Sequence, residues 1–366
     1  MENKQTGVSG NKKNVIEELN LDNFKSTMRR DFKELKEFFL DDERLHKLED
    51  KKPLERGFSM AWLLFKALFL KLTNARRVLL IIALILLVIN ISGTIGQTNI
   101  RFDNFFKILG GLVLLFILML ELKDKLLAHD ELAAGRQVQL ALMPESSPKI
   151  PGWDVWLYSM PANDVGGDLV DFIQLGENRF GLVLGDVAGK GLPAALFMAK
   201  LQATLRALVT EFDSMADLGA KINRIFHRDS IAKSFASLVY LELNPRSGHI
   251  NFLNAGHLPP LVLRDGKVES TEKGNLGLGI LASAPYKAKK ARLKRGDLFI
   301  VYSDGVSEAQ SEAEEFFGNE RLFKLLSEMK DPFVSEVGAK ILEAVDKFAG
   351  EAPRHDDLSL LILKRR

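Results

Sequence analysis

RFGLVLGDVAGKGLPAALFMAKLQATLRAL, residues 179–208, is the stretch that decides the fold. It opens with a short apolar run that ends on Asp186, as a buried strand does at its edge. A glycine-containing turn follows, and apolar residues then recur at helical spacing from Leu192 onward. A strand that passes through an acidic turn directly into a helix predicts a domain built from both kinds of element.

Other short strand-like runs lie on both sides of this stretch, between Trp153 and Lys364. They are rich in β-branched and aromatic residues, and their sequences are WDVWLYSM, DLVDFIQL, FASLVYLEL, HINFLNAG, DLFIVYSD and DLSLLILK. Helical patterns interrupt them at 192–211, about 214–228, 319–329 and 333–349. Strands joined by tight turns favour antiparallel sheets, and paired helices favour an α+β sandwich over a regular βαβ repeat.

The composition restricts the chemistry to carboxylates and hard cations. The chain has no cysteine, which excludes disulfides, thiolate metal sites and cysteine-based phosphatases. Its six histidines include no pair with the spacing of metal ligands, so aspartate and glutamate remain, and these favour Mg²⁺ or Mn²⁺. A formal net charge of +2 indicates no preference for polyanions, and nucleic acid is not an expected partner.

The N-terminal part of the chain predicts a cytoplasmic helical region followed by a membrane region. Residues 1–57 begin with a polar stretch that favours disorder and continue with highly charged helical patterns from residue 13. The membrane region is predicted over residues 58–122. It opens with FSMAWLLFKALFLKL (58–72), whose lysines suit a helix lying in the membrane interface.

Two apolar runs in this region predict a transmembrane helical hairpin. No charged residue occurs from Val78 to Ile100, and a span is expected at about 78–97. The second span is expected at about 105–122, provided that Lys107 snorkels to the interface. A soluble core helix would show a polar stripe, which the first run lacks. Basic residues flank both outer ends, so the positive-inside rule predicts a multi-pass protein of the cell membrane with both termini in the cytoplasm.

A linker helix is predicted over residues 121–144, because leucines at helical spacing continue beyond the second apolar run. Three prolines then end the helix and mark a domain boundary: Pro144, Pro148 and Pro151. A soluble domain is expected from 150 to 366.

Four acidic motifs stand at strand ends or in the adjoining turns of that domain. They are VGGDLVD (165–171), LGDVAGKG (184–191), YSDG (302–305) and HDDLS (355–359). Each motif alone is more typical of a turn than of a ligand. Together they supply oxygens from separate rigid segments, as the two-metal hydrolysis of a phosphate ester requires.

Other sites are weaker interpretations of the same residues. GDVAGKG is not a nucleotide-binding P-loop, because Gly191 follows Lys190 where that motif needs Ser or Thr. The pair His355–Asp356 lacks the further histidines of a metal-dependent HD phosphohydrolase. His257 in NAGHLPP is a candidate catalytic histidine, but the two prolines that follow it favour a structural turn.

Taken together, the motifs resemble the PPM class of metal-dependent protein phosphatases, and specifically its SpoIIE-type branch of sigma-factor regulators. The resemblance runs from about Leu132 to Lys364. It rests on LALMP in the linker and on VGGDLVDF, GLVLGDVAGKGLPAALFMA, LNAGHLPPLVL, LFIVYSDGVSEA and RHDDLSLLILK in the family's order. It implies a four-layer α-β-β-α sandwich of antiparallel sheets. It also implies an active protein serine/threonine phosphatase that uses water bound by two divalent cations, Mn²⁺ or Mg²⁺.

The resemblance assigns roles to individual residues. The implied metal ligands are Asp168, Asp186, the backbone carbonyl of Val187, Asp304 and Asp356. Asp168 and Asp186 form the catalytic pair, and Asp186 bridges both ions. Asp357 is the rival of Asp356 for the second site.

Further residues around this site receive supporting roles. Asp171 would orient a water on the metals. Three residues would shape the turn into the following helix: Gly189, Gly191 and Pro193. That helix is expected to bury Leu196, Met198 and Leu201.

By the same resemblance, the substrate is a phosphorylated STAS-type anti-anti-sigma regulator. The linker helix would join two copies into a homodimer and would carry signals from the membrane region. Two alternatives stay open, namely a membrane-tethered scaffold that binds a phosphoprotein without turnover and a hydrolase of small phosphoesters.

Overall fold

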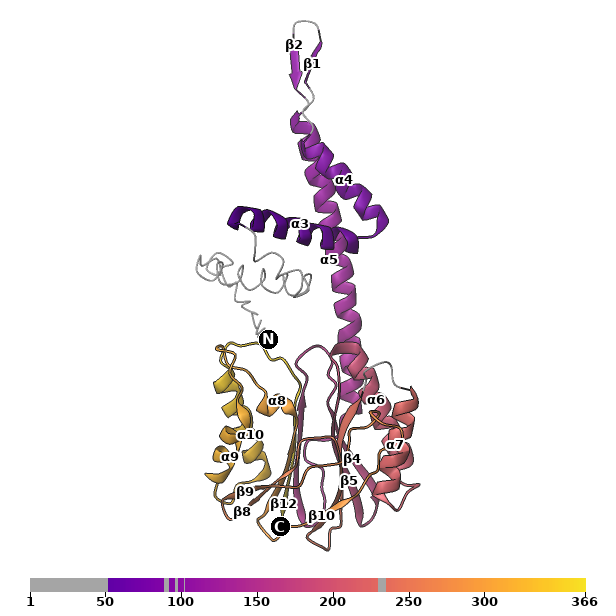
Figure 1. The fold of residues 1–366 in the computed structure, drawn as a ribbon, viewed down its shortest axis with the longest axis vertical. Coiled ribbons are helices and arrows are strands. Elements are labelled where there is room, and N and C mark those ends of the chain that lie inside the picture. Colours follow the sequence, from indigo (N-terminus) through magenta and orange to yellow (C-terminus); the bar gives the residue numbers. More distant parts are fainter. Residues whose placement is uncertain (1–51, 89–91, 96–97, 102, 230–234) are drawn as a thin grey trace, which may run out of the picture. The chain divides into compact units, whose positions relative to one another are not determined.

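Figure 1 shows the computed structural model of the chain, which describes residues 52–366 with gaps at 89–91, 96–97, 102 and 230–234. The chain divides into two compact units, residues 1–126 and residues 127–366. The helical patterns predicted between residues 13 and 51 lie outside the described residues.

The first unit consists of helices and a short hairpin. Its described elements are α3 (Pro53–Lys71), α4 (Asn74–Val88), β1 (Ser92–Ile95), β2 (Thr98–Arg101) and the first part of α5 (Asp103–Leu142). α4 packs closely on α5, since a Cβ on Gly110 would lie 3.0 Å from the carbonyl oxygen of Ala83. Near the start of α4, Arg76 donates hydrogen bonds of 2.7 and 2.6 Å to Glu121 and Asp124 of α5.

The first apolar run differs from the prediction of a helix up to about residue 97. α4 ends at Val88, and β1 begins at Ser92. Its 15 residues rise by about 22 Å, short of the roughly 30 Å apolar core of a bilayer. Serine, glycine and threonine follow the apolar run, and they are poorer helix formers than leucine. Over the described part of the chain, one helix is long and apolar enough to cross a membrane, at Phe105–Leu142. The two-span hairpin therefore stays a prediction.

The second apolar run and the predicted linker form one uninterrupted helix. α5 has 40 residues and ends at Leu142, directly before the first of the three prolines. The helix thus begins in the first unit and ends in the second.

The second unit contains two five-stranded antiparallel sheets. One sheet has the order β10-β7-β6-β5-β4, and its strands are β4 (Leu169–Gly176), β5 (Arg179–Val187), β6 (Ala236–Leu243), β7 (His249–Ala255) and β10 (Lys289–Arg292). The other has the order β3-β12-β11-β8-β9, and its strands are β3 (Trp153–Met160), β8 (Leu261–Arg264), β9 (Lys267–Ser270), β11 (Leu298–Tyr302) and β12 (Leu358–Arg365). The predicted α+β class with antiparallel sheets is confirmed.

Helices cover the outer face of each sheet (Figure 1). α6 (Gly191–Leu208) and α7 (Met215–Asp229) contact β4, β5 and β7. On the other side, α9 (Gly318–Ser327) and α10 (Val334–Ala349) contact β9, β12 and β3, with the single turn of α8 (Asp304–Ser307) beside β12. The sheets themselves meet through β12, β3, β4 and β5. The resulting layers run helix, sheet, sheet, helix.

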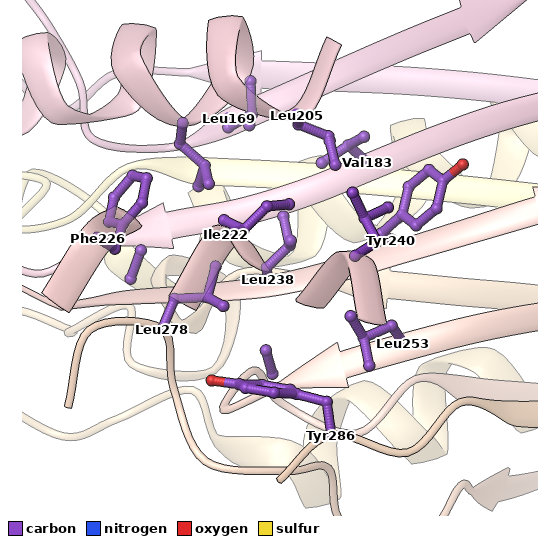
Figure 2. Close-up of a cluster of buried hydrophobic side chains, with 14 of the residues drawn as sticks. Leu169, Val183, Leu205, Ile222, Phe226, Leu238, Tyr240, Leu253, Leu278 and Tyr286 are labelled. Carbon is purple, nitrogen blue, oxygen red and sulfur yellow. The ribbon is translucent and has the colours of Figure 1, made fainter. Parts of the chain in front are cut away.

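Buried apolar side chains fill each of the three spaces between layers. Figure 2 shows the cluster between the first sheet and its helices, where Leu205 of α6 and Phe226 of α7 pack over Leu238 of β6. Met198 and Leu201 of α6 are buried as expected, but Leu196 is 62% exposed. Two residues in a helix correspond to about 200° of rotation, so Leu196 points away from the face that carries Met198.

Candidate active site

Three of the four aspartates predicted as ligands line one cavity of about 360 Å³ in the second unit. Asp186 lies next to the end of β5, Asp304 opens α8 directly after β11, and Asp356 precedes β12. Because β5 belongs to the first sheet and the other two strands to the second, the cavity is lined by the ends of inner strands from both sheets. Val187, whose backbone carbonyl is a predicted ligand, also lines the cavity. The predicted ligands that line the cavity therefore come from segments far apart in the chain.

The fourth aspartate, Asp168, is buried behind this cavity. It is 3% exposed, and its Oδ2 atom has no hydrogen-bond partner. Its loop packs against the other ligands, because a Cβ on Gly167 would lie 3.0 Å from the Val187 carbonyl oxygen and 3.5 Å from Asp186 Oδ1. Only glycine permits this close approach.

The electrostatics of the site are those of a like-charge cluster. Burial, followed by the charges of Asp304 and Asp356, raises the pKa of Asp186 to about 7. Burial and the charge of Asp356 raise the pKa of Asp304 to about 6. Burial and then the charge of Asp186 raise the pKa of Asp168 well above its ordinary value. Several carboxylates that raise one another's pKa values in one place are typical of a site for a divalent cation.

The acidic side chains of the cavity are spread apart in the structure. Over the described ranges, no group of three or more acidic or histidine side chains lies close enough together to hold a metal. Hard oxygen donors and the Asp168 Oδ2 atom without a hydrogen-bond partner fit Mg²⁺ or Mn²⁺ in chemistry.

Asp357 differs from its neighbour Asp356. Its carboxylate accepts hydrogen bonds from the backbone N–H groups of Ala162 at 2.8 Å, Gly167 at 2.6 Å and Asp168 at 3.2 Å. Asp357 is therefore occupied in holding the VGGD loop, whereas the Asp356 side chain is 41% exposed at the cavity. The geometry favours Asp356 as the ligand.

Asp171 faces away from the cavity. Both of its carboxylate oxygens accept hydrogen bonds from Arg206 of α6, at 2.7 and 2.6 Å, and the residue is fully buried. The predicted role of orienting a water does not fit this position. Asp171 instead ties β4 to α6.

His257 lines the cavity but has both ring nitrogens engaged. Nε2 lies 3.1 Å from the carbonyl oxygen of Tyr302, so it carries the proton and donates. Nδ1 then accepts from the Ser237 hydroxyl at 2.7 Å. Burial lowers the pKa of His257 to about 4, which keeps the ring neutral. These contacts favour the structural interpretation over the catalytic one.

The turn between β5 and α6 has the form that the sequence predicts. Gly189 and Gly191 have φ values of +121° and +67°, a region that favours glycine. Pro193 lies in the first turn of α6, where a proline is tolerated.

The structure adds two residues that sequence reasoning missed. Lys190 and Glu308 line the cavity beside the aspartates. The GKG segment places a basic residue in the turn after Asp186, which is the signal in the sequence for Lys190.

A third missed residue is Gln139, near the C-terminal end of α5. It is 4% exposed, and its side-chain amide donates to the carbonyl oxygen of Gly166 at 2.9 Å and accepts from the Gly166 N–H at 3.1 Å. The end of α5 therefore binds the same loop that Asp357 holds from the other side. A polar residue among leucines at the end of the helix was its only signal in the sequence.

Residues 176–366 match the family model described as stage II sporulation protein E (SpoIIE). The chain is 27% identical over 239 residues to phosphoserine phosphatase RsbU of Bacillus subtilis, covering 65% of this chain and 70% of that protein. It is 28% identical over 225 residues to protein IcfG of Synechocystis, covering 54% of this chain and 36% of that protein. This chain thus spans only about a third of the length of IcfG.

A solved structure agrees in fold. The SiaA-PP2C domain of Pseudomonas aeruginosa superposes with a TM-score of 0.58 at 19% identity, covering 66% of this chain and 99% of that domain. The family match covers more than half of the 366 residues, and the fold and the aspartates at the strand ends agree with it. The chain therefore belongs to the SpoIIE family within the PPM phosphatases, and its C-terminal unit is a protein serine/threonine phosphatase domain.

Proposed function

We propose that this chain hydrolyses phosphoserine or phosphothreonine on a protein substrate and needs divalent cations to do so. The observation that carries the proposal is the cluster of Asp186, Asp304 and Asp356 around one cavity, with Asp168 buried beside it. Burying several uncompensated carboxylates together costs folding free energy, so their retention in one place points to a bound cation.

Asp168, Asp186 and the Val187 carbonyl would hold one cation, and Asp186, Asp304 and Asp356 the other. Such cations supply the Lewis acidity for hydrolysing a phosphate ester. The protein's own residues orient these ligands. Asp357 holds the loop that carries Asp168, and the neutral His257 joins β6 to the end of β11 through Ser237 and Tyr302.

The substrate that we propose is a phosphorylated STAS-type regulator. The support is the family and the similarity to RsbU, whose name describes it as a phosphoserine phosphatase. The cavity opens to solvent through exposed residues such as Lys190 and Asp356, which suits a phosphate presented on a protein surface.

We further propose that α5 anchors the chain in the cell membrane, with the phosphatase domain in the cytoplasm. The apolar residues of its first half are largely exposed, among them Leu112, Leu115 and Leu118 at 52–62%. Exposed apolar surface of this extent needs a covering, and a bilayer matches its length. Carbonate extraction of membranes tests this: the full chain should stay in the pellet, and release into the supernatant would contradict the proposal.

The last turns of α5 also offer a surface to a second copy of the chain. Val138 and Leu142, which lie one helical turn apart on the same face, are 63% and 37% exposed. We expect light scattering of the detergent-solubilised chain to report a dimer that Val138→Glu weakens. An unchanged dimer in that variant would exclude this surface.

Activity is tested on the full chain in detergent with a phosphorylated STAS-domain protein and Mn²⁺. We expect phosphate release that a chelator abolishes. Asp186→Asn and Asp304→Asn should each lower kcat/KM by more than about 100-fold, because bound metal ions lower the activation free energy by several kcal/mol. The control is Asp213→Asn, at an exposed residue between α6 and α7.

Other outcomes would favour the alternatives. Tight binding of the phosphoprotein without phosphate release would favour a scaffold. Release from small phosphoesters alone would favour a different hydrolase. Release that persists in both ligand variants would contradict the proposed site.

A further inference from the structure

Lys190 stands at the mouth of the cavity, at the point where the β5–α6 turn enters the helix. Its ammonium group donates a hydrogen bond to the carbonyl oxygen of His355 and lies 3.8 Å from Asp356 Oδ2. The Lys190 side chain is 59% exposed and the Asp356 side chain 41% exposed. An ion pair this exposed and this long is weak, so the hydrogen bond to the His355 carbonyl oxygen is the main contact that holds the ammonium group.

The backbone around Lys190 is unusual on both sides. Gly189 and Gly191 both have positive φ values, and a Cβ added to either would meet no atom within 4 Å. The glycines are therefore not required by crowding. They shape a tight turn that brings the lysine, whose flexible side chain can reach several positions, to the cavity wall.

With cations and substrate bound, the cavity would carry an excess of negative charge, which a basic side chain would reduce. On the proposed function, the carboxylates of Asp168, Asp186, Asp304 and Asp356 carry about −4, which two divalent cations cancel. A phosphate monoester adds about −1.5 to −2 near neutral pH, and Glu308 adds another negative charge to the lining. Of the described lining residues, Lys190 is the one basic side chain, since His257 is held neutral.

We propose that Lys190 binds the phosphate group of the substrate. This inference rests on the proposed function and adds a specific residue to it. Lys190 pairs with Asp356 while the carboxylate is free. Once Asp356 turns to a cation, the ammonium group is released to the cavity, where the phosphate arrives. Lysine serves this purpose well because it binds phosphate as a mobile point charge.

Replacing Lys190 should affect the binding of Mn²⁺ and of phosphate differently. Lys190→Met removes a positive charge that competes with a cation for Asp356, so calorimetric titration should show Mn²⁺ binding unchanged or tighter. The same change removes a charge-assisted contact to phosphate, so the inhibition constant for inorganic phosphate and the KM for the phosphoprotein should both rise by about 10- to 100-fold. A merely structural role for Lys190 would weaken both ligands together.

Two further variants complete the test. Lys190→Arg keeps the charge and should retain most of the phosphate affinity. Lys330→Met, at an exposed lysine on a different surface, should change neither ligand. Calorimetry of inorganic phosphate with the Mg²⁺-loaded full chain measures the contact without turnover, so it separates this inference from the proposed activity. Phosphate affinity within twofold of the parent in Lys190→Met, or parallel losses of Mn²⁺ and phosphate, would overturn the inference while leaving metal-dependent hydrolysis intact.

Discussion

Five aspartates around the site of the second unit form two groups with different surroundings. Asp186, Asp304 and Asp356 line the cavity, and burial and mutual repulsion raise the pKa values of the first two. Asp171 and Asp357 are at least as buried, but every negative charge there is matched by donors. An aspartate surrounded by N–H donors stabilises the fold, whereas one surrounded by other carboxylates is available to a cation.

We expect the greatest loss of stability when Asp357 of the second group is replaced. Asp357→Ala would leave three backbone N–H groups around the VGGD loop without their acceptor, and hydrogen bonds to a charged group contribute roughly 1.5–3 kcal/mol each at most. We expect the free energy of unfolding to fall by about 3–4 kcal/mol in urea denaturation. Asp357→Asn keeps an acceptor oxygen and should lose less. Equal stability of Asp357→Ala and the parent would contradict the anchoring role.

The next effect concerns the contact between α5 and the same loop. Gln139→Leu would leave the N–H and carbonyl of Gly166 buried without partners, at a cost of about 2 kcal/mol. Since that loop carries Asp168, Mn²⁺ affinity measured by calorimetry should also fall. Val138→Leu, at the exposed neighbouring position, is the control. Weakened stability with unchanged Mn²⁺ affinity would limit Gln139 to a packing role.

A smaller effect follows from the raised pKa values in the cavity. At pH 6, Asp186 with a pKa of about 7 is roughly 90% protonated, so protons compete with the cation. We expect the Mn²⁺ association constant to fall about tenfold between pH 8 and pH 6, as followed by calorimetry. An association constant independent of pH over this range would show that Asp186 is ionised throughout.

The sign of the pH effect on stability follows from the same pKa values. The folded-state pKa values of Asp186 and Asp304 exceed the ordinary value of 3.8, so the folded state binds more protons than the unfolded state between about pH 4 and pH 7. The metal-free protein should therefore lose stability through these two groups as the pH rises through this window. Saturating Mn²⁺ should remove the trend in thermal unfolding.

We expect a smaller change of stability, of opposite sign, when Asp186 of the first group is replaced. In metal-free protein, Asp186→Asn removes one of the repelling charges and should raise the free energy of unfolding at pH 8 by about 1 kcal/mol, although the same change lowers the activity of the metal-loaded protein. The opposite signs of Asp186→Asn and Asp357→Ala distinguish the two groups directly. Destabilisation by Asp186→Asn would mean that its carboxylate is already stabilised by the protein.

Much of the fold was predictable because it depends on local patterns. The strand-like runs and helical segments of the second unit appear close to where the sequence predicts them. The predicted burial of Leu196 and the predicted length of the first apolar helix were wrong, because in each case the local sequence pattern is compatible with two structures. Leu196 and Met198 are equally apolar, yet only the packing of α6 on the sheet decides which of them is buried. An uncharged run after α4 can continue as a helix or turn back, and here a hairpin begins at Ser92.

The amino-acid sequence was enough to indicate the family, seven of the strands in the second unit and the position of Asp186 between a buried strand and a glycine turn. Those features are local, because strand periodicity and turn chemistry act over a few residues. The tertiary structure alone separated Asp356 from Asp357, turned Asp171 to Arg206, and brought Gln139 and Lys190 to the site. Asp357 and Gly167 are 190 residues apart, and contacts across such separations depend on how the two sheets pair and pack.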